Sequence, residues 1–194
     1  MSRGAKLVMY PLVLGGLMVA NILMAVDGRR AAAHAAELEG ATEWSGNWWK
    51  DYHWHKSTIY SSVGSSNTEA IRAVNRWNNS TDLQLPSKSA HTDISILRGA
   101  YGATGWRGLA SIESRARDSH CDGGYCEIKH CHATLNTSYS GTAWRYEGTY
   151  CMEMGHCFGL AHDTDNGCMN SSAMNAGTSN QPSSGNISDI NRRY

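Results

Sequence analysis

The chain has 194 residues, of which 17 are basic and 17 are acidic, so its formal net charge is zero. Nothing in this balance suggests a nucleic-acid or membrane-surface partner, so we expect no nucleic acid, and a membrane only if the N-terminal segment described next is retained. About 160 residues follow the N-terminal leader described next, which is enough for one domain with its own core. We therefore expect a single domain that acts as a monomer.

Residues 1–36 have the layout of an export signal. Arg3 and Lys6 precede an apolar run at 7–26 that contains no charged residue, and small residues at 31–35 offer places for cleavage. Cleavage would release a secreted, extracellular protein. Because the apolar run is long enough to cross a bilayer of about 30 Å, retention as a membrane anchor is the alternative. In both cases the rest of the chain would face the outside.

Residues 37–56 form a second segment, which is rich in tryptophan. The stretch EWSGNWWKDYHWHK at 43–56 contains four of the seven tryptophans, together with His53 and His55. Aromatic side chains near a chain terminus usually cover the core, and this is the interpretation we favour. The alternative is a surface that binds a sugar or a peptide.

An amphipathic helix is predicted at 67–81, where the sequence reads NTEAIRAVNRWNNST. Ile71, Val74 and Trp77 fall on one face at helical spacing. Asn67 or Thr68 would serve as its N-cap, because their side-chain oxygens can accept from the first free N–H groups of a helix.

Strands are expected after this helix. Polar and apolar residues alternate at 93–97 (DISIL), and a short apolar run lies between turn signals at 108–112 (GLASI). The segment at 127–139 would form the last strand and would end in a polar loop. A second helix would then begin near Ala143.

That second helix leads into the stretch CMEMGHCFGLAHD at 151–163, which carries the chemistry. Positions 152 and 156 share one helix face and would both point at one metal ion. Glu153 would act as general base on a water molecule. Gly159 would leave the helix through a left-handed conformation and bring His162 back to the same ion. Three protein ligands and one open position are what a catalytic zinc needs.

This stretch resembles HExxHxxGxxHD, the zinc signature of the metzincin metallopeptidases, and its GHxxGLxHD core is closest to the matrixin-like branch. The resemblance implies an α+β fold for 57–194: one domain with a twisted, mostly parallel sheet, a first strand at 57–63, an early helix, a metal-site helix and a short C-terminal helix around ISDINRRY. It also implies a zinc-dependent endopeptidase that acts on proteins or peptides. A turn with a methionine would lie beneath the metal, and Met169 is the candidate, with Met174 second.

The sequence departs from this signature at Met152, which stands where the first histidine is expected. A thioether is a soft, neutral ligand that binds zinc poorly and suits Cu(I) better. Three interpretations follow. Zinc can be held by His156, His162 and a replacement such as Asp163 or a distant histidine. The metal can instead be lost, which would leave an inactive binding module, or Met152 can join the two histidines in a copper site. For Met152 alone, ordinary core packing is a further explanation.

Six cysteines lie between residues 121 and 168, which is typical of an exported protein with disulfides. Cys121 and Cys126 would close a local loop. Cys151 or Cys157 would then pair with Cys168, and Cys131 would take the other; the pairing we favour is Cys151 with Cys168 and Cys131 with Cys157. The spacings lack the paired CxxC elements of a cysteine-ligated zinc site.

His130 and His132 are two residues apart on the last expected strand and would share one of its faces. The metzincin resemblance implies that additional structural zinc or calcium can be bound, and this pair is the candidate for such an ion. Exposed polar histidines are the alternative.

Overall fold

The computed structural model describes residues 52–114, 121–122, 125–170, 172 and 179–194. The expected export signal, the first 15 residues of the Trp-rich segment (37–51) and Met174 lie outside the described residues. None of the described helices is long and apolar enough to cross a membrane.

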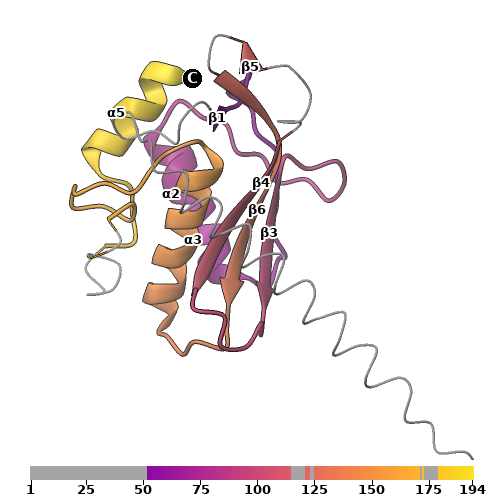
Figure 1. The fold of residues 1–194 in the computed structure, drawn as a ribbon, viewed down its shortest axis with the longest axis vertical. Helices are drawn as coiled ribbons and strands as arrows, with labels where there is room; N and C mark the ends of the chain where they lie inside the picture. The colour runs from indigo at the N-terminus through magenta and orange to yellow at the C-terminus, as the bar shows by residue number, and fades with distance from the viewer. Residues whose placement is uncertain (1–51, 115–120, 123–124, 171, 173–178) are drawn as a thin grey trace, which may run out of the picture.

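The fold is of the α+β type: the described residues form one mixed sheet and three helices, which lie on one side of it (Figure 1). The strands are β1 (Tyr52–His53), β2 (Ser61–Ser62), β3 (Ile94–Gly99), β4 (Gly108–Ser114), β5 (Cys121–Asp122) and β6 (Tyr125–Asn136). The helices are α2 (Thr68–Ser80), α3 (Ala143–Cys157) and α5 (Ser184–Arg193).

The long strand β6 organises the sheet. It pairs in parallel with β1 and β3 and antiparallel with β4 and β5, while β2 pairs in parallel with β3. The register places Ile94 beside Cys131 and Gly108 beside Leu135. Three of the five pairings are parallel, so the expected mostly parallel sheet is confirmed. Among the described strands, β4 pairs only with β6, and the Ala110 N–H of β4 donates to the Glu153 carboxyl group on α3.

Helix α2 begins where the sequence predicts, because the side chain of Asn67 caps it by accepting from the Ala70 N–H. Its buried face consists of Ala70, Ala73, Val74 and Trp77. The expected face contained Ile71, which is only half-buried. Ala70 and Ala73 are fully buried instead, so small side chains take part of the buried face where a larger one was expected.

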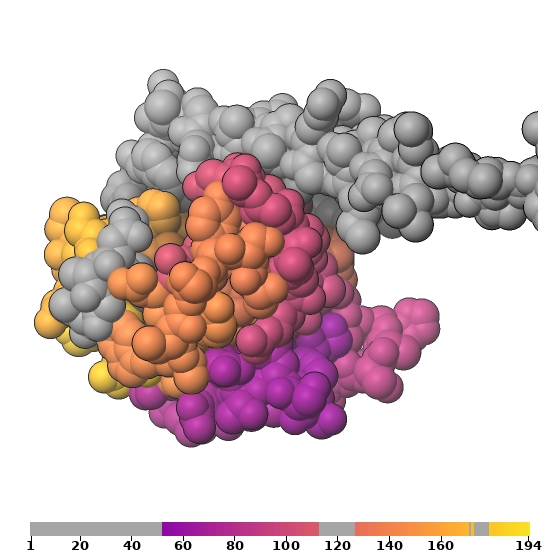
Figure 2. Space-filling view, turned by 90° about the horizontal axis from the view of Figure 1, so that it is seen from below, coloured from indigo at the N-terminus to yellow at the C-terminus, as the bar shows by residue number. Residues whose placement is uncertain are grey.

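Helix α3 is buried along most of its length between α2 and the sheet. Trp77 donates from Nε1 to the Cys151 carbonyl oxygen at 3.0 Å, and its ring meets Phe158 edge-on at 5.4 Å. On the other side, the Tyr150 hydroxyl donates to the Leu97 carbonyl at 3.1 Å. Seen from below, the purple surface around the start of α2 adjoins the orange surface around the start of α3 (Figure 2).

Two disulfides fasten α3 at its C-terminal half, and both have the pairing we favoured from the sequence. Cys131 on β6 is bonded to Cys157, and Cys151 is bonded to Cys168 in the following loop. The first bond ties the helix to the central strand. The second ties the helix to the segment that returns beneath it. For Cys121 and Cys126 the register makes their Cα atoms partners, and their bond stays a prediction.

The strand expected at 57–63 was wrong in extent, since only Ser61 and Ser62 form a ladder with β3. The remainder bonds to a different segment: Ile59 N–H donates to the Gln84 carbonyl at 2.8 Å, and Ser61 N–H donates to the Pro86 carbonyl at 3.0 Å. Because Pro86 has no N–H to donate, that segment cannot form a complete ladder of backbone hydrogen bonds with 57–63. The last strand was also overextended, because β6 ends at Asn136, whose side chain bonds the loop at 101–106.

The helix contact around Gly155 leaves no space for a side chain, and this gives a test of the packing. A methyl group at Gly155 would clash with Met169 Sδ and lie 3.1 Å from Trp77 Cζ2, and both of these neighbours are fully buried. We expect Gly155→Ala to lower the free energy of unfolding by about 1–3 kcal/mol through overpacking. Chemical denaturation measures it. Gly64→Ala is the matched control, because nothing lies within 4 Å of a β-carbon there; equal effects at both sites would contradict the packing.

Candidate metal centre

The site is built on the last turns of α3 and on the loop that follows. Met152, Glu153 and His156 are all buried, with exposed fractions of 9%, 5% and 5%. The helix ends at Cys157, and Gly159 has φ of +92°, so the left-handed exit expected from the sequence is confirmed. The chain then reverses direction and returns toward the helix.

This reversal brings His156 and His162 together, with 3.1 Å between their Nε2 atoms. The Nδ1 atom of His156 lies 2.8 Å from the Leu160 carbonyl oxygen. A carbonyl can only accept, so this contact assigns the proton to Nδ1 and leaves a lone pair on Nε2. The Leu160 carbonyl therefore holds the His156 ring in an orientation that directs its basic nitrogen, Nε2, at His162.

Burial, together with the smaller effect of the nearby His162, lowers the pKa of His156 to about 3, although the hydrogen bond to the Leu160 carbonyl opposes the shift. His156 is consequently neutral at physiological pH, the form in which histidine binds metals. Two nitrogens bound to one tetrahedral zinc at 2.0–2.1 Å would lie about 3.3 Å apart. The separation of 3.1 Å is close to that value, so the two histidines fit a pair of ligands on one ion.

No third conventional ligand joins them in the described part of the chain, where no group of three His, Cys, Asp or Glu side chains is placed to hold a metal. Asp163, one of the expected replacements, faces elsewhere: Oδ2 accepts from Asn186 Nδ2 at 2.5 Å, and Oδ1 accepts from the Asp165 N–H at 3.1 Å. Met152 precedes His156 by one helical turn and is buried on the same helix. Of the two candidates, only Met152 has a side chain without a competing polar partner.

Glu153 lies against the beginning of β4. A methyl group at Gly108 would clash with its Oε1 atom, so the glycine provides the space that the carboxyl occupies. The Ala110 N–H donates to the carboxyl group. Burial raises the pKa of Glu153 to about 8, although the Ala110 hydrogen bond lowers it in part. A nearby cation would lower the pKa of Glu153 and favour its ionised form, which can act as a base.

Met169 is the methionine that the resemblance leads us to expect beneath the site, and that role stays a prediction. Its side chain is fully buried and packs on Gly155, and its carbonyl accepts from the Asp163 N–H at 3.2 Å. The adjacent Cys168 carries the disulfide to Cys151. The turn around Met169 therefore supports the helix directly under the two histidines.

Two residues for which the sequence indicated no contact with this helix close the C-terminal end of α3. Trp54 Nε1 donates to the Cys157 carbonyl at 2.8 Å, and the Tyr194 hydroxyl donates to the Phe158 carbonyl at 2.8 Å. These are helix-end acceptors that would otherwise lack partners. Trp54 is buried, which agrees with the core-covering role expected for the Trp-rich segment. No local pattern marks Tyr194, since its role depends on the position of the C-terminal helix.

The histidines on β6 do not form a ready second site. Both ring nitrogens of His130 are engaged, Nδ1 with the Thr92 carbonyl at 2.9 Å and Nε2 with Ser95 Oγ at 3.1 Å. The His130 and His132 rings lie 4.7 Å apart, centroid to centroid, so they do share a face. An additional structural ion at this pair stays a prediction. Of the two residues, His130 already makes hydrogen bonds to protein atoms through both ring nitrogens.

The buried, neutral His156 has a consequence for stability. In metal-free protein its folded-state pKa of about 3 lies below the ordinary value of 6.5. The unfolded chain thus binds a proton at this residue between pH 6.5 and 3, and stability falls as the pH is lowered through that window, by up to about 1.4 kcal/mol per pH unit.

We expect His156→Gln to remove this dependence of stability on pH. The wild type should therefore lose stability relative to the variant as the pH is lowered from 6.5 to 4.5. Urea unfolding in the presence of a chelator measures the difference. His91→Gln, which removes an exposed histidine, is the control. A wild-type-to-variant difference that stays constant with pH would refute the assignment.

Comparison with known proteins adds little to this geometry. No family model matches the chain, and no curated protein matches it. The chain is similar to the solved structure "GM1 bound form of the ECX AB5 holotoxin", with 12% identity, coverage of 73% of this chain and 83% of that chain, and a TM-score of 0.49. It is also similar to myroilysin, with 16% identity, coverage of 57% and 52%, and a TM-score of 0.36. Similarity at this level does not establish a family or an activity.

Proposed function

We propose that this chain is a secreted, zinc-dependent endopeptidase whose metal is held by His156 and His162. Metal binding would be weakened by Met152, which stands at the first ligand position. The observation that carries the proposal is the convergence of the two Nε2 atoms, 3.1 Å apart, on the face of a buried helix that also carries Glu153. Two disulfides in the described residues are compatible with an extracellular protein.

The positions of the side chains suggest a separate catalytic role for each. When bound, zinc would supply Lewis-acid polarisation of the scissile carbonyl and lower the pKa of a water molecule to about 7. Glu153, held against β4 by the Ala110 N–H, would accept a proton from that water and pass it to the leaving amine. The Leu160 carbonyl keeps His156 in the tautomer that binds metal. Met152 supplies only a weak, neutral donor.

The edge of β4 with which no described strand pairs offers a place for the substrate backbone. An extended peptide can add to such an edge through main-chain hydrogen bonds. Glu153 lies beside Gly108 and Ala110 at the start of this strand, so a peptide laid along it would pass the general base. This arrangement favours hydrolysis of extended peptide segments over that of small molecules.

Metal content separates this proposal from the two other interpretations of Met152. We expect protein purified without added metal to contain zinc at a substoichiometric level, as measured by elemental analysis, because two histidines and a thioether hold zinc weakly. Copper in place of zinc would favour a copper site formed by Met152, His156 and His162. Protein that remains metal-free after incubation with either ion would favour a binding module.

Met152→His should restore a third nitrogen ligand and tighten zinc binding by about tenfold or more. Competition with a chromophoric chelator measures the affinity, and casein hydrolysis should rise in parallel. Met152→Leu is the matched control, since it keeps the apolar volume without the thioether. Unchanged zinc affinity in the histidine variant would count against position 152 as a ligand position.

Glu153→Gln should reduce casein hydrolysis by about 100-fold or more, in the range that general acid-base catalysis contributes. Zinc content should be unaffected, because Glu153 is not a ligand in the proposed site. The control is Glu69→Gln on α2, which removes a carboxylate paired with Arg98. If hydrolysis persists in the Glu153 variant, the chemistry resides elsewhere.

A further inference from the structure

The turn that joins His156 to Leu160 depends on contacts from outside itself. The Gly159 N–H donates to the His156 carbonyl at 2.9 Å, within the turn. The next two carbonyls, those of Cys157 and Phe158, accept from side chains that are 103 and 36 residues away in the sequence. Their peptide groups link the His156 ring to the Leu160 carbonyl that orients it, so the donors that hold these groups also hold that orientation.

Trp54 and Tyr194 are the two donors. The indole Nε1 of Trp54 donates to the Cys157 carbonyl at 2.8 Å. The hydroxyl of Tyr194 donates to the Phe158 carbonyl at 2.8 Å and accepts from the Trp54 N–H at 3.2 Å. Since the Phe158 carbonyl can only accept, these contacts direct the hydroxyl proton at Phe158. Burial raises the pKa of Tyr194 to about 12, so the hydroxyl keeps this proton at physiological pH.

Both donors are fixed by the elements that carry them. Trp54 follows β1, which pairs with β6, and its side chain is buried. Tyr194 caps the C-terminal end of α5, where its N–H donates to the carbonyl of the fully buried Ile190 at 2.9 Å. Helix α5 is tied to the loop after α2, because Asn191 Oδ1 accepts from the Asp82 N–H at 2.8 Å. This end of α5, marked C, lies beside β1 (Figure 1).

Loss of either donor would disturb the turn. Cys157 and Phe158 are fully buried, and a buried carbonyl without a donor is costly. Rotation of the peptide group toward another donor would relieve that cost. It would also move the Leu160 carbonyl away from His156 Nδ1, where it now lies at 2.8 Å. Without that acceptor both tautomers of the neutral ring become accessible, and one of them carries its proton on Nε2, where it blocks a metal ion.

We propose that Tyr194 and Trp54 are positioning residues for the metal centre. They hold the turn at 157–160 so that the Leu160 carbonyl stays on His156 Nδ1 and the Nε2 atom stays available to a metal ion. For its metal this inference rests on the proposed function, whereas the tautomer of His156 depends on the protein alone. Both residues act through the backbone of the turn.

Tyr194→Phe tests the inference, because it removes the hydroxyl group and keeps the aromatic ring. Heteronuclear NMR of the imidazole rings in metal-free protein at neutral pH reports the tautomer of His156. We expect the wild type to carry the proton on Nδ1 and the variant to contain a mixture of both tautomers. Zinc affinity, measured by competition with a chromophoric chelator, should fall about tenfold, which is the lower end of the effect of losing an outer hydrogen bond at a metal site.

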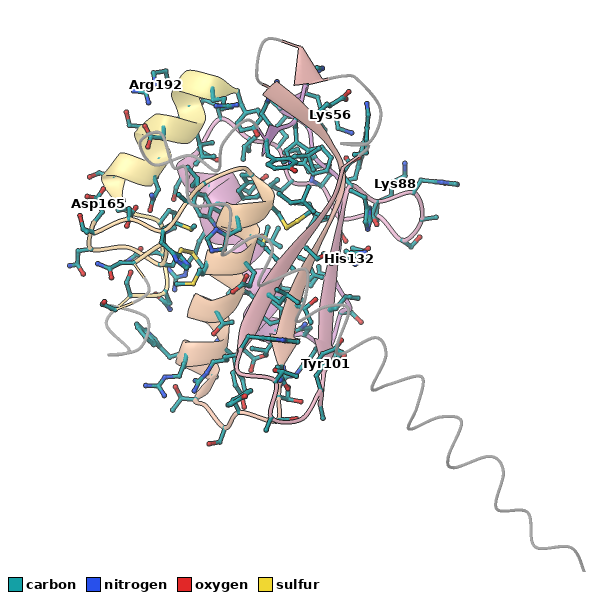
Figure 3. The ribbon with its side chains drawn as sticks, in the orientation of Figure 1. Lys56, Lys88, Tyr101, His132, Asp165 and Arg192 are labelled. Atoms are coloured by element: carbon teal, nitrogen blue, oxygen red, sulfur yellow. A yellow bond between two sulfur atoms is a disulfide. The ribbon has the colours of Figure 1, made fainter. Side chains whose placement is uncertain are left out.

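Tyr150→Phe is the matched control. Tyr150 is fully buried on α3, and its hydroxyl donates to the Leu97 carbonyl at 3.1 Å and accepts from Asn67 Nδ2 at 2.8 Å. The control therefore removes the same kinds of hydrogen bond without altering the turn. Arg192→Gln is a second control, because Arg192 lies on α5 and points away from the sheet (Figure 3). Neither control should change the His156 tautomer or the zinc affinity.

Circular dichroism checks the folding of each variant. If Tyr194→Phe does not fold, Trp54→Phe decides the matter, since it removes the indole donor to the same turn. An unchanged His156 tautomer in the folded variant would overturn the inference, and so would an unchanged affinity in a protein that binds zinc. Equal effects in Tyr150→Phe would also overturn it, because they would indicate a general loss of stability.

The positioning role and the proposed activity can fail separately. A mixture of tautomers in Tyr194→Phe, in a chain that binds no zinc and hydrolyses no casein, would support the positioning of His156 and reject the peptidase. Casein hydrolysis that depends on Glu153, with a single His156 tautomer in every variant, would support the peptidase and reject the positioning role.

Discussion

The hydrogen bond between His156 and the Leu160 carbonyl sets the geometry of the whole site. It spans only four residues, yet it requires the helix to end at Cys157 and the chain to turn back at once. Gly159 makes that turn with φ of +92°, a conformation that is costly for residues with a β-carbon. The hydrogen bond therefore fixes the tautomer of His156. The turn that makes this bond possible also brings His162 beside it.

Once this turn is in place, its surroundings are constrained as well. The returning chain passes beneath α3, where Met169 fills the space left by Gly155 and Cys168 reaches Cys151. On the opposite side, Gly108 makes space for Glu153. Two glycines on different elements thus admit a thioether and a carboxyl group to positions that any larger residue would block. The site depends on small residues as much as on its ligands.

The sequence was informative where chemistry depends on local spacing. Helical periodicity and an N-cap placed α2, and the motif placed His156, Gly159 and His162. Spacing around the motif also favoured the pairing of Cys131 with Cys157. It failed where neighbours come from elsewhere in the chain. The Gln84–Pro86 segment that replaces most of the first expected strand, and the role of Asn136 in ending β6, depend on contacts that no local pattern records. The meeting of Trp54 and Tyr194 at the end of α3 belongs to the same class.

Both disulfides in the described residues include a cysteine of α3, and this links the site to the redox state of its surroundings. Before oxidation, neither the attachment of the helix to β6 nor that of the returning loop to the helix exists. A newly made chain in a reducing cytosol would hold its two histidines on a helix and a loop that are free to separate. Exposure to an oxidising compartment would lock them together. For a protein exported as we propose, the two histidines would therefore be fixed beside each other late, at the time of export rather than of synthesis.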